Sequence, residues 1–272
     1  MRALPPLNKF FADRGPHLAA MIAYFALMSF VPLLFLTISL LALAGRPNES
    51  SYLVTELKRA LPGSSVSSIV EAIAGIQAHA TALGIVGGAA LLWTSLSLFS
   101  VLESAVNIVY GQPNRSFLRG KLVAVGLLLL SLVAMFVGLL VGSFGFDLLK
   151  RYAEGFASNT YIAYGLSVAV SLLAVFIFLV AIYYFLTNVE HSFVDVLPGA
   201  VVAALVLEAS FQVLPLYVRF SSNVVALKAF GGPALLLVWL YVMANVIVFG
   251  AEVNWWLSRP AAREAEEAAG LA

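Results

Sequence analysis

Six long apolar runs dominate this chain and restrict what it can fold into. Each run reaches the ~20 residues that a helix needs to cross a bilayer. In hydrocarbon, every backbone N–H and C=O must find a partner inside the protein, so each run is predicted to be a helix. The sequence therefore predicts an all-α, polytopic membrane protein with six transmembrane helices. The runs cover residues 18–44, 82–110, 120–146, 160–187, 197–219 and 231–257.

Composition supports a membrane protein and excludes several other classes. Of the 272 residues, 62% are hydrophobic and 11% are charged, whereas soluble domains are about 25% charged. The net charge of +1 gives no strong field to attract nucleic acid. The absence of cysteine excludes disulfides and thiolate metal sites. The expected partners are the lipid bilayer and a lipid or small solute, and no nucleic acid.

The segment between the first two runs, 46–80, is too polar to cross a bilayer. Its apolar residues recur at helical spacing on either side of Pro62-Gly63, which predicts two short amphipathic helices. Such helices either lie in the membrane interface or gate a cavity, and the sequence leaves both possibilities open. The predicted plan is a cytoplasmic N-terminal segment (1–17), a membrane domain (18–257) and a cytoplasmic tail (258–272).

The orientation follows from the short loop between the second and third runs. Residues 111–121 contain three basic residues and no acidic residue. Basic residues in short loops favour the cytoplasmic side. Because an even number of spans places both termini on one side, we expect both termini in the cytoplasm.

Three glutamates lie inside the apolar runs: Glu103, Glu208 and Glu252. A charged side chain at the centre of a membrane helix costs about 3 kcal/mol on insertion scales. In the predicted topology Glu208 is about 16 Å deep, while Glu103 and Glu252 lie about 8 to 10 Å from the cytoplasmic end. They either tie helices together through hydrogen bonds or line a cavity that binds a cation or carries protons.

Further polar residues share the depth or the face of these glutamates. Asn107 follows Glu103 by four residues, Gln212 follows Glu208 by four, and Asn254 comes two after Glu252. Residues four apart share one face of a helix. Tyr24 in the first run reaches about the depth of Glu252. The predicted substrate or ion pathway comprises Glu103, Glu208, Glu252, Gln212, Asn107, Asn254 and Tyr24.

Two prolines, Pro32 and Pro215, fall inside the first and fifth runs. Proline removes one helical hydrogen bond and its ring clashes with the preceding turn, so each is predicted to kink its helix. Kinks would give these helices alternative packings.

Signals for chemistry are weak. The three histidines, His17, His79 and His191, lie far apart and lack the spacing of metal ligands. The chain has no phosphate-binding loop, no Gly-x-Ser-x-Gly and no His-Glu-x-x-His. The sequence therefore predicts no enzyme, no cofactor and no metal.

Five segments carry a resemblance to a known family: 19–33, Leu-Pro-Gly at 61–63, Leu-Pro-Gly-Ala at 197–200, 237–241 and 250–254. Taken in order, they resemble the YihY / virulence-factor BrkB family of bacterial inner-membrane proteins. The similarity extends over about 10–257. It implies six spans and an inner-membrane location, and for some members the movement of lipid-linked or small solutes. The family has also carried the labels of serum-resistance factor and ribonuclease BN.

These observations leave two main hypotheses. The first is a transporter or lipid flippase with a polar, cytoplasm-facing cavity walled by the glutamates. The second is an envelope scaffold that transports nothing, in which the glutamates only lock helices together. A membrane hydrolase or ribonuclease is the least supported reading, because it needs a metal or nucleophile cluster.

Overall fold

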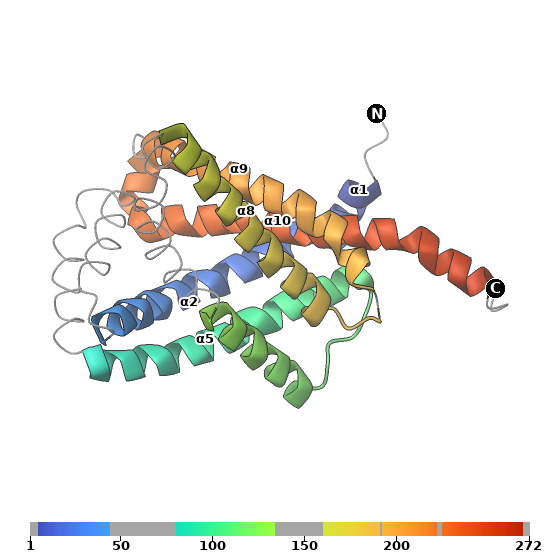
Figure 1. Cartoon of the computed structure of the whole chain (residues 1–272), viewed down its shortest axis with the longest axis horizontal. Helices are drawn as coiled ribbons and strands as arrows, with labels where there is room; N and C mark the ends of the chain where they lie inside the picture. Colours follow the sequence, from blue (N-terminus) through green and yellow to red (C-terminus); the bar gives the residue numbers. More distant parts are fainter. Residues whose placement is uncertain (1–4, 44–79, 134–159, 191, 222–224, 269–272) are drawn as a thin grey trace. The chain divides into compact units, whose positions relative to one another are not determined.

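The computed structural model describes residues 5–43, 80–133, 160–190, 192–221 and 225–268, and within these ranges the chain is helical with no strand. Figure 1 follows the helices in chain order. Residues 117–133 form a further, unlabelled helix. The labelled elements are α1 (Pro5–Ala12), α2 (Gly15–Leu43), α5 (Ala80–Tyr110), α8 (Thr160–Leu186), the 3-10 turn η2 (Phe193–Val196), α9 (Leu197–Ser221) and α10 (Val225–Ala268).

Four stretches among the described residues are long and apolar enough to cross a membrane. They overlap the second, fourth, fifth and sixth predicted runs. Helices α2 and 117–133 cover the described parts of the first and third runs, so the count of six spans stays a prediction. Residues 46–79 of the predicted amphipathic segment lie outside the described residues. The four stretches are Ile85–Tyr110, Tyr164–Leu186, Phe193–Val213 and Leu236–Ser258.

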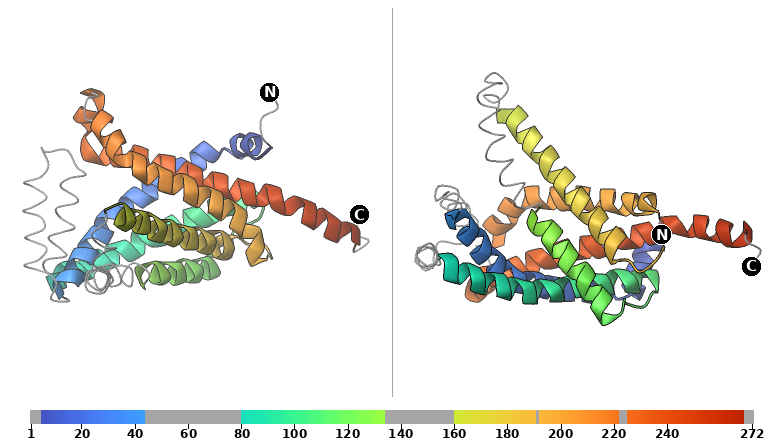
Figure 2. Two further views of the ribbon diagram at one scale, coloured as in Figure 1. Left: turned by 45° about the horizontal axis from the view of Figure 1, so that its top comes forward. Right: turned by 60° about the horizontal axis from the view of Figure 1, so that its bottom comes forward.

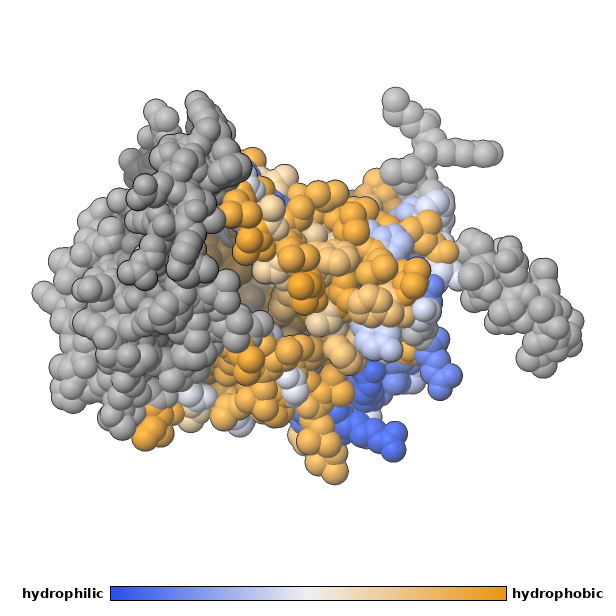
Figure 3. All heavy atoms as spheres, viewed as in Figure 1, coloured by the Kyte–Doolittle hydropathy of each residue, from blue (hydrophilic) through white to orange (hydrophobic). Residues whose placement is uncertain are grey.

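Most of the surface of these four stretches is not covered by the rest of the chain. At most 39% of any of them is buried inside the protein. Apolar residues make up most of the described surface visible in Figure 3. Hydrocarbon is the medium in which such a surface is stable, since water would leave large apolar areas unburied.

The chain divides into two compact units. One comprises residues 1–16, 102–209 and 246–272, and the other comprises 17–101 and 210–245. Helices α5, α9 and α10 each contribute to both units. All contacts between helices described below lie within the first unit, which carries Glu103, Glu208 and Glu252.

Helix α5 ends where its sequence predicts, at a glycine. Gly111 has a φ of 67°, a left-handed conformation that glycine adopts without the steric cost other residues meet. The Gly111 N–H donates to the Ile108 carbonyl (3.0 Å) and the Gln112 N–H to the Asn107 carbonyl (2.8 Å). This pair of bonds is a Schellman motif, which satisfies the last carbonyls and turns the chain into the 111–116 loop.

The connection from α8 to α9 is short and capped. Ser192 and Asp195 form a capping box around η2. The Ser192 hydroxyl accepts the Val194 N–H, and the Asp195 carboxylate accepts the Ser192 N–H (2.8 Å). Helix α9 then begins at Leu197-Pro198, where the missing N–H of proline costs nothing. Figure 2 shows α8 and the first half of α9 running back from this connection.

The two prolines do not end their helices. Helix α2 continues through Pro32 from Gly15 to Leu43, and α9 continues through position 215 to Ser221. The kinks expected at Pro32 and Pro215 stay predictions.

Several hydroxyl groups in the apolar helices are satisfied within their own helix. Each of these donates to a backbone carbonyl three or four residues earlier, the usual solution where no water is present. Examples are Ser29 to Phe25 (2.9 Å), Thr94 to Ala90 (3.0 Å), Ser97 to Trp93 (3.2 Å) and Ser100 to Leu96 (2.6 Å).

Candidate functional site

Glu103 pairs with an arginine that comes from outside the apolar runs. Its side chain is 5% exposed, and its Oε1 lies 3.4 Å from a guanidinium nitrogen of Arg115. The same oxygen accepts the backbone N–H of Arg115 at 3.2 Å. Gly120 permits this approach, because a Cβ there would lie 3.0 Å from Glu103 Oε2. The 111–116 loop thus folds back over the end of α5 and neutralises its acid.

Arg115 also closes the end of α8. It donates to the carbonyls of Leu186 (2.6 Å) and Thr187 (2.7 Å). The last carbonyls of a helix lack intrahelical donors and carry the negative end of the helix dipole. One planar guanidinium therefore serves a buried carboxylate and two terminal carbonyls, which a single ammonium group does less well.

Lys9 plays the corresponding role for Glu252. Its ammonium lies 3.3 Å from Glu252 Oε2, contacts Asp13 and donates to the Val109 carbonyl in the last turn of α5 (2.7 Å). It also stands over the ring of Trp255, 4.2 Å from the centroid, a favourable cation–π contact. Lys9 therefore fastens α1 to the last turn of α5 and to the second half of α10.

Glu252 depends on this one cation more than Glu103 depends on Arg115. Its side chain is fully buried. Among the described residues, neither of its carboxylate oxygens receives a hydrogen bond. Removing one member of a buried ion pair commonly costs 3–5 kcal/mol, because the remaining charge is left uncompensated.

Asn107 joins α5 to two connections. The buried side chain donates to Asn114 Oδ1 (3.2 Å) and accepts the backbone N–H of Asn188 (2.8 Å). The Asn188 side chain donates to the Pro113 carbonyl (3.0 Å). These bonds link the end of α5 to the 111–116 loop and to the segment that follows α8.

Asn254 caps α9 from the neighbouring α10. Its Oδ1 accepts the Gly199 N–H (2.6 Å), one of the first-turn donors that a helix cannot satisfy itself. Its Nδ2 has no partner among the described residues. The two helices meet closely here, since a Cβ on Gly199 would clash with the Gly250 carbonyl and with Asn254.

These residues lie at the ends of α5 and α8, at the start of α9 and in the second half of α10, and Lys9 docks α1 beside them. We call this cluster the polar junction, defined by Lys9, Glu103, Asn107, Arg115, Glu252 and Asn254. Each of its side chains bonds to a helix end, to a loop or to another member. This arrangement holds the helices together.

Glu208 stands apart from the polar junction. It is nine residues beyond Gly199 on α9, about 14 Å at the helical rise. The side chain is 6% exposed, and its Oε2 accepts the Ser171 hydroxyl of α8 at 2.7 Å. This bond joins α8 and α9 inside the membrane-crossing stretches of both helices.

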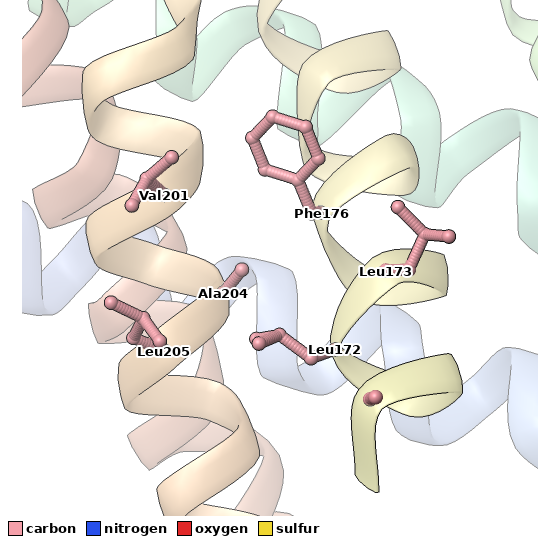
Figure 4. A pocket seen from close by; sticks show the side chains of 7 residues that line it. Leu172, Leu173, Phe176, Val201, Ala204 and Leu205 are labelled. Atoms are coloured by element: carbon pink, nitrogen blue, oxygen red, sulfur yellow. The ribbon is translucent and has the colours of Figure 1, made fainter. Parts of the chain in front are cut away.

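An apolar groove lies between α8 and α9 beside this bond. Its volume is about 460 Å³. Figure 4 shows Leu172 and Phe176 of α8 and Ala204 of α9 projecting between the two helices. Leu172 is next to Ser171 in the chain, and Ala204 is one turn before Glu208. We call this the α8–α9 groove; it is lined by Ala169, Leu172, Leu173, Phe176, Val201, Ala204 and Leu205.

The other predicted pathway residues lie elsewhere. Gln212 is exposed on α9, one turn beyond Glu208, and Tyr24 is exposed on α2. Both belong to the second unit. Among the described residues, no group of three or more histidine, aspartate or glutamate side chains could hold a metal ion. The pathway as a whole stays a prediction.

The model of the virulence factor BrkB family matches residues 7–271. The chain belongs to the virulence factor BrkB family. This confirms the resemblance seen in the sequence and makes the chain a membrane protein.

Individual relatives of this BrkB-family chain are distant. The ribonuclease-like protein YfkH of Bacillus subtilis (strain 168) is 27% identical over 259 residues, 91% of each chain. A UPF0761 membrane protein of Chromohalobacter salexigens is 27% identical, and one of Rhodospirillum centenum is 26% identical. The matches to these two cover 92% and 90% of this chain, but only 62% and 55% of the relatives. No solved structure matches the chain.

Sequence reasoning missed three partners of the glutamates in this BrkB-family chain: Lys9, Arg115 and Ser171. Lys9 and Arg115 lie outside the apolar runs, so neither belongs to the run that carries its glutamate. The depth of the glutamates could have indicated these two partners, because Glu103 and Glu252 lie near the ends of their runs, within reach of basic residues outside the membrane. Ser171 was one serine among several in apolar runs, and nothing in the sequence distinguished it.

Proposed function

We propose that this BrkB-family chain is a transporter that moves a lipid or another amphipathic small solute along the seam between α8 and α9. We place it in the bacterial inner membrane, with both termini in the cytoplasm. Glu208 is the residue that would meet the polar part of the solute. The proposal assigns no catalytic role to any residue and needs no cofactor.

The observation that carries the proposal is the Ser171–Glu208 hydrogen bond beside the α8–α9 groove. A buried carboxylate inside a membrane span is costly and is usually functional. Here it adjoins a hydrocarbon-lined groove, so a polar group and an apolar chain of one solute would find matching surfaces side by side. A polar headgroup could replace the Ser171 hydroxyl on Glu208 while its chain stays in the groove.

The arrangement of α8 and α9 supports motion at this seam. Their connected ends are held by Arg115 on the terminal carbonyls of α8 and by Asn254 on the first turn of α9. Further from that connection, the Ser171 hydroxyl donates to Glu208 and joins the two helices again. A seam held firmly at one end and joined through a side-chain hydrogen bond further along is suited to opening.

The polar, cytoplasm-facing cavity expected from the sequence takes a different form in this proposal. Glu103 and Glu252 act as structural ties in the polar junction, and Glu208 alone serves the solute. The proposed solute path is the seam between α8 and α9 in place of a cavity walled by all three glutamates.

The alternative is an envelope scaffold that transports nothing. The polar junction favours it, because Glu103, Asn107, Glu252 and Asn254 all bond to helix ends, loops or cations. The two functions differ in what they require of Glu208. A transporter needs its charge, whereas a scaffold needs only a hydrogen-bond acceptor, which glutamine supplies.

Purified protein in proteoliposomes tests the proposal with Glu208→Gln. Fluorescent phosphatidylethanolamine, phosphatidylglycerol and a small organic cation serve as probes, each measured across a pH series. We expect Glu208→Gln to lower transport of at least one probe about tenfold or more, since losing a charged hydrogen bond costs 1.4 kcal/mol or more.

Glu103→Gln is the matched control, because it removes a buried charge of the polar junction and leaves the seam unchanged. Folding of both variants is checked by their elution and helical content. A folded Glu208→Gln protein with wild-type transport of each probe at each pH rejects the transport role of Glu208. No transport by the wild-type protein favours the scaffold.

A further inference from the structure

A second apolar groove follows the first along α8. It has a volume of about 360 Å³ and is lined on α8 from Phe176 to Phe185. Leu130 of helix 117–133 and Phe193 of η2 complete its wall. Phe176 lines both grooves, so they meet at this one side chain.

The two grooves follow a single stripe of α8. Ala169, Leu172, Phe176, Val180 and Tyr184 are spaced by three or four residues, which places them on one face of the helix. From Ala169 to Phe185 the stripe extends about 24 Å at the helical rise. That is most of the ~30 Å thickness of a bilayer's hydrocarbon core. The two grooves together therefore form a long surface, which we call the furrow.

Hydrocarbon is the ligand that fits this surface. The linings are formed by apolar side chains, with Tyr184 near one end. Leu173 and Leu205 remain 57% and 54% exposed, in helices apolar enough to cross a bilayer. An acyl chain gains van der Waals contacts along such a furrow.

The two ends of the furrow differ in polarity. One end lies at Phe193 and Tyr184, next to the short α8–η2–α9 connection. The other end lies at Ala169 and Leu172, beside Ser171 and its bond to Glu208. A lipid whose headgroup lies near the connection would extend its chain toward Glu208.

We propose that the two grooves form one binding site for a single long acyl chain of a membrane lipid. The headgroup end lies at Phe193, the chain passes Phe176, and its terminus lies at Ala169. This names a substrate class for the α8–α9 seam. In transport, the headgroup would leave Phe193 and move along the stripe until it meets Glu208, and only this role rests on the proposed transport function. Binding of the chain itself depends on the grooves alone.

Three alanines on α8 provide a matched test. Ala169 and Ala181 line the two halves of the furrow. Ala174 comes seven residues before Ala181, which places it on nearly the same face of the helix, but neither lining includes it. Ala169 and Ala174 are exposed and Ala181 is half-buried, so tryptophan at each position adds bulk without filling the protein core.

Native mass spectrometry of the purified full chain reports bound lipid. The probes are dioleoyl and didecanoyl phosphatidylglycerol, which share a headgroup and differ in chain length. We expect Ala181→Trp to lower occupancy by both lipids about threefold or more, since it blocks the half nearest the headgroup. Ala169→Trp is expected to do so for the dioleoyl lipid alone, and Ala174→Trp for neither.

The proposal is overturned if both furrow variants retain the two lipids as the wild type does. It is also overturned if Ala174→Trp loses lipid equally, or if Ala169→Trp weakens both lipids alike. The transport assay with Glu208→Gln is independent of these results. If lipid binding depends on chain length as expected but no probe is transported, the lipid site is supported and the transport function is rejected. If transport requires Glu208 but the furrow variants bind lipid as the wild type does, the transport function is supported and the lipid site is rejected.

Discussion

Each glutamate in the membrane has a partner of a different kind. Glu103 meets the fork of Arg115, Glu252 meets the ammonium of Lys9, and Glu208 meets the hydroxyl of Ser171. The two cations also satisfy terminal carbonyls of α8 and α5. Each therefore offsets the cost of a buried acid at a place where a helix end already favours positive charge. Ser171 brings no charge to Glu208.

The Lys9–Glu252 pair gives a prediction at this scale. Lys9→Met leaves a fully buried carboxylate without its cation, so we expect about 3–5 kcal/mol of destabilisation. Adding Glu252→Gln should recover part of that loss, because the uncompensated charge is removed. Thermal unfolding in detergent measures both variants.

Arg14→Met is the control for Lys9, since Arg14 is an exposed basic residue close to the same helix. It should unfold as the wild type does. If Lys9→Met and the double variant were equally stable, or if Lys9→Met matched the control, Glu252 would not depend on Lys9.

At the scale of whole helices, glycine sets how closely α9 and α10 pack. A Cβ at Gly199 would meet the Gly250 carbonyl and the Asn254 amide that caps α9. Beside Gly250, the Tyr183 hydroxyl donates to the Ile247 carbonyl (2.7 Å), so α8 joins the same contact. Close backbone approach of this kind is how helices associate in lipid, where no hydrophobic force drives them together.

Gly199→Ala tests this packing. Alanine favours a helix over glycine by about 1 kcal/mol, but here its methyl group would separate α9 from α10. We expect a net destabilisation of about 1–3 kcal/mol, the usual cost of overpacking. Thermal unfolding in detergent is the measurement.

Gly165→Ala on α8 provides the comparison, because nothing lies within 4 Å of a Cβ at that position. It should leave stability unchanged or raise it by up to about 1 kcal/mol. Equal behaviour of the two alanine variants would show that α9 and α10 tolerate a wider spacing.

For the whole molecule, the polar junction requires several distant segments to lie on the same side of the membrane. The 111–116 loop and the segment after α8 are bonded to each other there, and α1 is bonded to the last turn of α5. Since the natural chain has no cysteine, single cysteines at exposed Asn8, Ser116 and Glu190 can be labelled selectively.

We expect a membrane-impermeant maleimide to label all three positions only after the inner membrane is permeabilised, as a cytoplasmic junction requires. Labelling of any one position in intact spheroplasts while the other two stay protected would contradict the arrangement. Uniform labelling of all three in intact spheroplasts would keep the junction and reverse the orientation.

The helices were predictable from the sequence because hydrocarbon permits few alternatives for a long apolar run. The end of α5 before Gly111 and the start of α9 at Leu197-Pro198 could also be predicted. The partners of the glutamates could not be predicted. Glu252 and Lys9 lie at opposite ends of the chain, and Ser171 and Glu208 are 37 residues apart. Such pairings depend on how helices pack, which apolar periodicity alone does not specify.

The contact between Lys9 and Glu252 also has a consequence for biosynthesis. A ribosome makes Lys9 near the start and Glu252 near the end, and at about 5–20 residues per second the delay is on the order of tens of seconds. Throughout that interval α1 has no Glu252 to bind. The polar junction is therefore completed only after α10 has been made, and its closure marks a chain in which α10 has been inserted.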